Sequence, residues 1–246
     1  ASDLSVTGVE ALLRWQHPTR GMVPPALFVA IAEKAGLMPA LGRFVFRAAV
    51  DQHREWASRG RFMPVAVNAS ALQFDDANFV PDLLAIIREA GVAPDMIEVE
   101  ITETMVMADY ASAAEKVRLL REAGLSVSVD DFGVGFSNLS QLSRLSVNAL
   151  KIDRSLVMQI GLDRKAEAII LAVVGMAHAM ELKTIAEGVE TPQQAAFLRK
   201  AGIDAMQGYL LGLPMAPGHL EAWAQARGLS RVASLQGNVR HALAAS

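Results

Sequence analysis

The fold is decided in the middle of the chain, by the stretch MIEVEITETMVMADYASAAEKVRLLREAGLSVSVD (96–130). Two apolar runs of strand length, MIEVEI (96–101) and LSVSVD (125–130), flank a helix-length segment (109–123). In that segment apolar residues recur every three or four positions, and charged residues fill the opposite face. A strand, a helix and a second strand in this order predict a parallel pair joined by an outer helix.

The same alternation extends in both directions along the chain. Ala-Gly followed by an apolar residue recurs after helical segments, which is typical of a helix end. The predicted strands are 6–13, 62–68, 96–101, 125–130, 147–152, 182–187 and 203–207. The predicted helices are 25–35, 40–58, 76–90, 109–123, 163–180 and 192–201. This pattern predicts an α/β fold, a (β/α)₈ barrel short by one strand, with a doubly wound open sheet as the alternative.

The composition excludes several classes of protein. The chain has 246 residues, of which 52% are apolar, so it is not disordered. It has no cysteine, which excludes disulfides and Cys-ligated metal sites. Lys and Arg number 23 against 26 Asp and Glu, a net charge of 23 − 26 = −3, which argues against binding a nucleic-acid polymer. No apolar run is long enough for a membrane span. We expect one domain over 1–246, with a helical tail at 220–246.

Polar side chains stand at the carboxyl end of nearly every predicted strand. Along the chain they are Glu10, Asn68, Glu100, Asp130, Asp131, Lys151, Asp153, Glu187 and Gln207. In a parallel barrel these ends meet on one face, and that face carries the active site. The sequence therefore predicts that residues far apart in the chain converge in one carboxylate-rich cup.

Six carboxylates against one lysine would repel each other, and a divalent cation resolves that repulsion. The donors are all oxygens, which favours Mg²⁺ or Mn²⁺, with Ca²⁺ as a competitor. The adjacent Asp130 and Asp131 suit a pair of ions about 3.5–4 Å apart, as in two-metal hydrolysis of phosphate esters. Asp131-Phe132-Gly133 also matches the kinase DFG motif, but the chain lacks the other kinase motifs.

An ordered series of motifs then resembles one family. EALLRW begins at Glu10, and further matching segments follow at 21–36, 67–70, 98–104, 130–142, 150–157, 186–191 and 206–215. This series resembles the EAL domain family of cyclic di-GMP phosphodiesterases. The resemblance covers roughly Gly8 to Pro217 and keeps the order of the motifs throughout.

The resemblance implies a role for each matching residue. The implied metal ligands are Glu10, Asn68, Glu100, Asp130, Asp131 and Glu187. The implied catalytic residues are Lys151, Glu187, Asp131 and Gln207, and the implied substrate contacts are Arg14, Leu13, Asp153 and Gln207. A loop that links the metal site to a dimer interface is implied at Glu103, Gly133, Gly135, Phe136, Ser137 and Asn138.

The family reaction is hydrolysis of cyclic di-GMP to linear pGpG with Mg²⁺ or Mn²⁺, and Ca²⁺ is expected to inhibit it. The resemblance further implies a cytoplasmic domain without membrane contact, a homodimer, and an attached GGDEF cyclase or sensory domain in a longer protein. In the family a first, antiparallel strand precedes the Glu10 motif, and we expect that strand to be missing here. Two alternatives stay open: a catalytically inactive cyclic di-GMP receptor, and an unrelated metal-dependent barrel enzyme such as a lyase.

Overall fold

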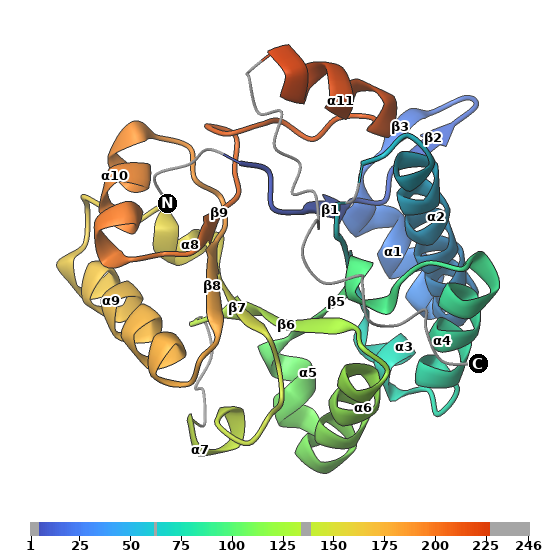
Figure 1. Ribbon diagram of the computed structural model, residues 1–246, viewed down its shortest axis with the longest axis horizontal. Coiled ribbons are helices and arrows are strands. Elements are labelled where there is room, and N and C mark those ends of the chain that lie inside the picture. The colour runs from blue at the N-terminus through green and yellow to red at the C-terminus, as the bar shows by residue number, and fades with distance from the viewer. Residues whose placement is uncertain (1–4, 62, 134–138, 227–246) are drawn as a thin grey trace, which may run out of the picture.

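The computed structural model describes residues 5–61, 63–133 and 139–226. In these residues seven parallel strands form one sheet, in the order β1-β4-β5-β6-β7-β8-β9. They are β1 (Val9–Ala11), β4 (Val65–Asn68), β5 (Ile97–Thr102), β6 (Ser126–Phe132), β7 (Ala149–Ile152), β8 (Lys183–Ala186) and β9 (Ala205–Met206). The sheet curls into an open ring with β1 and β9 at its two ends (Figure 1). All seven predicted strands are found, and the predicted α/β barrel class is confirmed.

Helices cover the outer side of this ring (Figure 1). They are α1 (Pro25–Lys34), α2 (Met38–Ser58), α3 (Ala71–Asp75), α4 (Phe79–Ala90), α5 (Glu103–Ala108), α6 (Tyr110–Glu122), α7 (Leu139–Leu142), α8 (Arg154–Val157), α9 (Arg164–Ala179), α10 (Pro192–Ala201) and α11 (Pro217–Ala226), with a 3₁₀ turn, η1, at Pro94–Met96. None of the described helices is long and apolar enough to cross a membrane. The end of the predicted tail beyond Ala226 lies outside the described residues.

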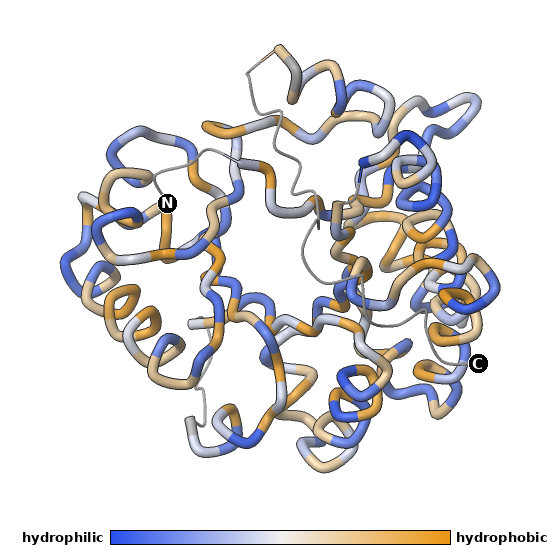
Figure 2. The backbone as a smooth tube through the Cα atoms, in the orientation of Figure 1, coloured by the Kyte–Doolittle hydropathy of each residue, from blue (hydrophilic) through white to orange (hydrophobic). Residues whose placement is uncertain are grey.

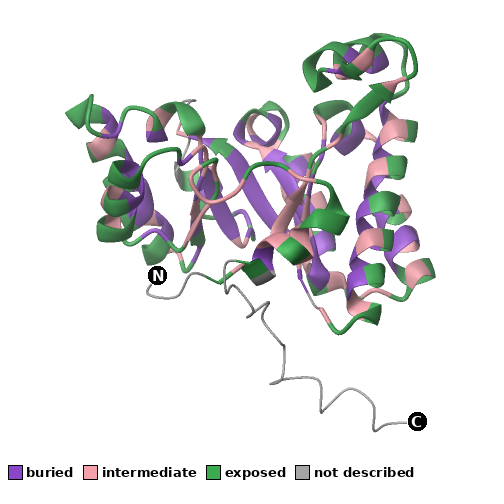
Figure 3. Cartoon of the chain, turned by 90° about the horizontal axis from the view of Figure 1, so that it is seen from above, coloured by how far each residue is buried: buried purple, intermediate pink, exposed green. Residues whose placement is uncertain are grey.

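The core lies between the sheet and the helices, because strand side chains alternate between the two faces of the sheet. On β5, Ile97, Val99 and Ile101 are fully buried. The alternate positions Glu98 and Glu100 therefore belong to the inner face of the ring. Figure 2 shows hydrophobic helix faces turned toward the sheet, and Figure 3 shows buried strands between helices with exposed outer surfaces. The outer face of the sheet thus builds the core and leaves the inner face for polar residues.

Local signals explain where the helices end. The recurring Ala-Gly phrase closes α4 at Gly91 and α10 at Gly202, each with a positive φ that only glycine adopts without strain. A separate antiparallel hairpin, β2 (Trp15–His17) with β3 (Gly21–Val23), was not predicted. It is the one described antiparallel pair, and it lies outside the main sheet.

β6 carries an irregularity at its carboxyl end. Its register with β7 shifts between Val129 and Phe132, and Asp131 has a φ of 55°. A non-glycine residue in this left-handed region is strained and therefore uncommon. The shift lets the adjacent Asp130 and Asp131 occupy different environments: Asp130 is buried and Asp131 is exposed.

Candidate active site

The carboxyl ends of the parallel strands bring polar side chains to one rim of the ring. Glu10 comes from β1, Asn68 from β4, Glu100 from β5, Asp130 from β6 and Lys151 from β7. Glu187 follows β8 and Gln207 follows β9 directly. Seven side chains predicted from widely separated parts of the sequence therefore lie together, and we call these seven the cup.

Lys151 is the centre of the cup. Its side chain is only 2% exposed, and its Nζ lies 2.7 Å from Glu100 Oε1 and 2.6 Å from Glu187 Oε1. Asp130 Oδ2 is 3.6 Å away and Glu10 Oε2 is 4.0 Å away. In the described part of the chain, one buried ammonium thus faces four carboxylates.

Glu10 connects the two ends of the sheet through its side chain. Asn68 Nδ2 donates to Glu10 Oε1 at 2.6 Å, and Gln207 Nε2 donates to Glu10 Oε2 at 2.6 Å. Glu10 and Gln207 belong to opposite ends of the sheet order. Because Asn68 and Gln207 are exposed whereas Glu100 and Lys151 are buried, the cup opens to solvent on this side.

The electrostatics show an excess of negative charge. Burial raises the pKa of Glu100 to about 8, although the nearby Lys151 opposes the rise. Burial also raises the pKa of Glu187 to about 6, again against Lys151. Burial disfavours the charged form of Lys151, but the surrounding carboxylates outweigh it and raise the lysine's pKa. A second cation near these groups would therefore be bound favourably.

The donor set suits a hard divalent cation. All the acceptors are carboxylate or amide oxygens, as Mg²⁺ and Mn²⁺ require. Glu100 Oε2 is buried and has no hydrogen-bond partner among the described residues, so one oxygen of a central ligand is unused. Within the same residues no three Asp, Glu or His side chains have a metal-holding geometry. The physical reason is that the carboxylates are drawn to Lys151, which occupies their common centre.

Asp131 and Asp153 lie at the margin of the cup. The pKa of Asp131 is raised by partial burial and by the negative charges of Asp130 and Asp153. The Asp131 backbone N–H donates to Asp130 Oδ1 at 2.9 Å, so the bend fixes the buried neighbour. Asp153 accepts a bond from the Ser155 N–H at 2.9 Å and caps α8. Both carboxylates are thus available beside the cup without contacting Lys151 closely.

Two further sequence-predicted residues have hydrogen bonds to groups outside the seven cup residues. Arg14 is exposed and donates to the Leu13 carbonyl at 2.9 Å. Glu103 is buried, and its Oε2 accepts from the Gly133 N–H at 3.4 Å, where the predicted coupling loop begins. The rest of that loop, Gly135, Phe136, Ser137 and Asn138, lies outside the described residues.

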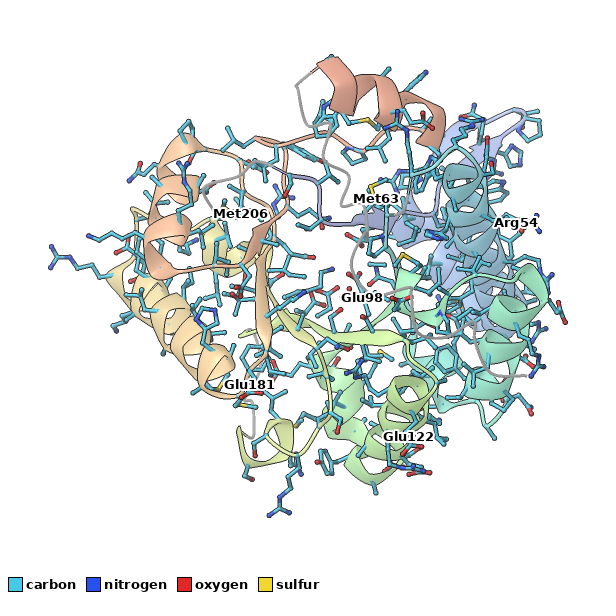
Figure 4. All side chains as sticks on the ribbon, in the orientation of Figure 1. Arg54, Met63, Glu98, Glu122, Glu181 and Met206 are labelled. Carbon is cyan, nitrogen blue, oxygen red and sulfur yellow. The ribbon has the colours of Figure 1, made fainter. Side chains whose placement is uncertain are left out.

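The predicted site residues leave out further polar groups, two of them on the inner face of the ring. Glu98 belongs to the inner face of β5, and Figure 4 shows it inside the ring, whereas Glu122 lies on the outer helix α6. Ser128 pairs in register with Glu100 and is fully buried. Strict alternation along β5 and β6 places both on the inner face. Gln73 and Gln194 were also missed, although each stands three residues after Ser or Thr, the pattern of a capping box.

Comparison with known proteins identifies the family. The profile of the EAL domain matches residues 1–214. The cyclic di-GMP phosphodiesterase NbdA of Pseudomonas aeruginosa is 39% identical over 226 residues, which cover 92% of this chain and 29% of NbdA. The cyclic di-GMP phosphodiesterase PdeR of Escherichia coli is 38% identical over 218 residues, covering 89% of this chain and 33% of PdeR. The chain thus spans about a third of the length of these curated relatives.

A solved structure agrees with this assignment. The PaMucR phosphodiesterase, in a complex with c-di-GMP, superposes with a TM-score of 0.85 at 39% identity. The alignment covers 87% of each of the two chains. The match in sequence extends over the strands that build the cup as well as over the helices around them. The chain belongs to the EAL domain family.

Proposed function

We propose that this chain is a phosphodiesterase domain that hydrolyses cyclic di-GMP to linear pGpG. The observation that carries the proposal is the ring of four carboxylates and two amides around the buried Lys151, delivered by successive strands of the described sheet. Phosphodiester hydrolysis needs positive charge for the phosphate and a held water, and this cup is built to collect cations. The relatives named as cyclic di-GMP phosphodiesterases supply the substrate class.

The residues that would hold two Mg²⁺ or Mn²⁺ ions are those with free or shared oxygens in and beside the cup. They are Glu10, Asn68, Glu100, Asp130, Asp131 and Glu187. When bound, the ions would supply Lewis-acid stabilisation of the phosphate charge and a more acidic water. Ca²⁺ is expected to inhibit, because it takes more ligands at longer distances and in looser geometry.

The chain's own groups would orient the reactants. Lys151 stays protonated and would hold a water or a phosphate oxygen by donating to it. Glu187, whose pKa is raised to about 6, would accept a proton from that water near neutral pH. A bond forms from the water oxygen to phosphorus, the bond from phosphorus to the ribose 3′ oxygen breaks, and that oxygen takes up a proton. Gln207 would hold Glu10 in place during this exchange.

Substrate contacts and assembly belong to the same proposal. Arg14, Leu13 and Asp153 would contact the dinucleotide at the open side of the cup, because they stand just beyond β1 and β7. MucR of Pseudomonas aeruginosa is named a bifunctional diguanylate cyclase and cyclic di-GMP phosphodiesterase. We infer that this chain likewise forms one cytoplasmic domain of a longer signalling protein, that it dimerises, and that Glu103 couples the loop after Gly133 to that dimer.

The experiment is a hydrolysis assay on cyclic di-GMP with Mg²⁺, with Mn²⁺ and with a chelator. Linear pGpG that appears only with metal supports the proposal. Binding of the dinucleotide without turnover in any metal would instead favour the inactive receptor.

Glu10→Ala sharpens this assay. It removes a proposed ligand and the acceptor of two hydrogen bonds, so turnover should fall by more than about a hundredfold. The metal-free protein should change in stability by no more than about 1 kcal/mol, because a repulsive carboxylate is lost together with those bonds. Glu33→Ala, on the exposed face of α1, is the control. A large loss of metal-free stability in Glu10→Ala would identify a structural residue instead of a ligand.

A further inference from the structure

Among the described helices, α3 and α10 share the same N-terminal arrangement, and each begins shortly after a strand that supplies the cup. In α3 the Gln73 N–H donates to Ser70 Oγ at 3.3 Å, and Gln73 Oε1 accepts from the Ser70 N–H at 3.0 Å. In α10 the Gln194 N–H donates to Thr191 Oγ1 at 3.2 Å, and Gln194 Oε1 accepts from the Thr191 N–H at 2.9 Å. Both are reciprocal capping boxes closed by a glutamine.

These glutamines lie inside the protein. Each is only 7% exposed, which is unusual for a residue that caps a helix end at the surface. Gln73 packs on Gly42 of α2 so closely that a Cβ at that glycine would lie 1.2 Å from Gln73 Nε2. The turn after β4 is therefore clamped between its own helix and α2.

The second turn reaches two members of the cup. Gln194 Oε1 also accepts from the Glu190 N–H at 2.8 Å, so it holds two successive peptide groups of the turn that begins at Glu187. In the same turn the Val189 N–H donates to the Gln207 carbonyl at 2.9 Å. Gln207 in turn donates to Glu10. The clamp thus holds the turn three residues after Glu187, and one backbone bond joins the same turn to Gln207.

We propose that Gln73 and Gln194 are positioning residues of the cup, an inference that rests on the proposed function. Asn68 lies two residues before Ser70, and Glu187 lies four residues before Thr191. Without the glutamine oxygen, N–H groups at partly buried positions of each turn lose their acceptor, and the turn is free to rearrange. Ligand side chains displaced by a fraction of an ångström bind a cation less well, so the clamps act on metal affinity.

The chain offers a matched control cap. Asp163 caps α9 by accepting from the Lys165 N–H at 2.8 Å, but α9 does not follow directly on a strand of the cup. Asp163→Ala therefore removes a helix cap, formed by one exposed bond, while leaving both clamped turns intact. Comparing it with Gln194→Ala separates loss of a cap from loss of position.

The experiment measures Mn²⁺ affinity by titration with electron paramagnetic resonance, beside thermal melting and the kcat and KM of hydrolysis. Gln194→Ala and Gln73→Ala should each weaken Mn²⁺ binding by about tenfold or more, whereas Asp163→Ala should leave it unchanged at a comparable loss in Tm. Gln194→Glu keeps an acceptor oxygen and should restore most of the affinity. The hydrolysis defect should lie in kcat at limiting Mn²⁺ and shrink as Mn²⁺ is raised.

A second variant keeps the test decisive if Gln73→Ala does not fold. Gly42→Ala changes no clamp or cup residue, yet it forces Gln73 to move, so it should weaken Mn²⁺ binding as well. Mn²⁺ affinities of Gln194→Ala and Gly42→Ala equal to that of Asp163→Ala would overturn the inference. An unsubstituted chain that binds no Mn²⁺ and hydrolyses nothing would overturn the proposed function itself, which is a distinguishable result.

Discussion

Two polar clusters lie at opposite ends of the same sheet, and they treat negative charge in opposite ways. In the cup, four carboxylates share one ammonium and a buried oxygen of Glu100 has no partner among the described residues. At the amino ends of β8 and β9, Asp204 Oδ2 accepts bonds from His178 Nε2, the Thr184 N–H and the Thr184 hydroxyl. We call His178, Thr184 and Asp204 the amino-end cluster.

The pKa directions follow from this difference. Hydrogen bonds from Thr184 and His178 outweigh partial burial and lower the pKa of Asp204, so this carboxylate is ionised at no cost to the fold. In the cup burial outweighs Lys151 and raises the pKa of Glu100 to about 8. A carboxylate whose hydrogen bonds are all made, as at Asp204, stabilises the folded protein without a ligand. Carboxylates that lack partners, as in the cup, gain free energy only when a cation binds to them. This agrees with the division of barrels into a functional carboxyl face and a stabilising amino face.

Removing the central cation should have the largest effect. Lys151→Met leaves buried carboxylates without their partner, so the free energy of unfolding of the metal-free protein should fall by about 3–5 kcal/mol. Urea denaturation with a chelator present measures this. Lys183→Met, at an exposed position on the neighbouring strand, is the control and should change little. Equal stability of the two variants would show that the cup carries no excess charge.

The cup should also make stability depend on pH. Between pH about 4.5 and 8 the folded state keeps a proton on Glu100 that the unfolded chain has released. Stability of the metal-free protein should therefore fall as the pH rises through this window, by at most about 1.4 kcal/mol per pH unit from this group. Urea midpoints from pH 5 to 8 test this, and Glu100→Gln, which cannot titrate, should flatten the curve. Excess Mn²⁺ should remove the dependence near pH 8, since it favours the ionised carboxylate.

The amino-end cluster should respond in stability alone. Asp204→Ala removes the acceptor of three hydrogen bonds, two of them from the buried Thr184, so unfolding should cost about 1–3 kcal/mol less. Mn²⁺ affinity and turnover should match those of the unsubstituted chain when measured well below its Tm. A loss of Mn²⁺ affinity would contradict the separation of the two clusters.

Some features of the fold and the cup were predictable from the sequence and others were not, for physical reasons. The strands and outer helices were predictable because hydrophobic periodicity is local, and the polar strand ends were predictable because a parallel barrel gathers them. The hairpin β2–β3 was missed because three-residue strands carry too little periodicity. The bond from Gln207 to Glu10 spans 197 positions and depends on how the sheet curls, which spacing does not specify.

Side-chain pairing was harder to predict than side-chain placement. The sequence predicted Lys151 beside the carboxylates, but not that Glu100 and Glu187 would hold it most closely. The amino-end cluster was missed altogether, because His178 on an apolar helix resembles a core residue and Asp204 stands at a strand start. A search for polar residues at the carboxyl ends of strands finds the functional face of a barrel. It does not find polar clusters at the amino ends, on the opposite face.

The smallest effect tests whether the amino-end cluster works by hydrogen bonding alone. His178→Ala removes one of three donors to Asp204 and spares the two from Thr184, so the free energy of unfolding should fall by about 0.5–1 kcal/mol. Because the His178 side chain is 43% exposed, water can replace part of its bond. In Asp204→Ala the same histidine has lost its partner, so adding His178→Ala there should cost almost nothing more. The free energy of unfolding of the double variant is measured by urea denaturation. A full additional loss there would show that His178 stabilises the fold through packing and not through its hydrogen bond to Asp204. The amino-end cluster and the cup would then differ in packing more than in how their carboxylates are satisfied.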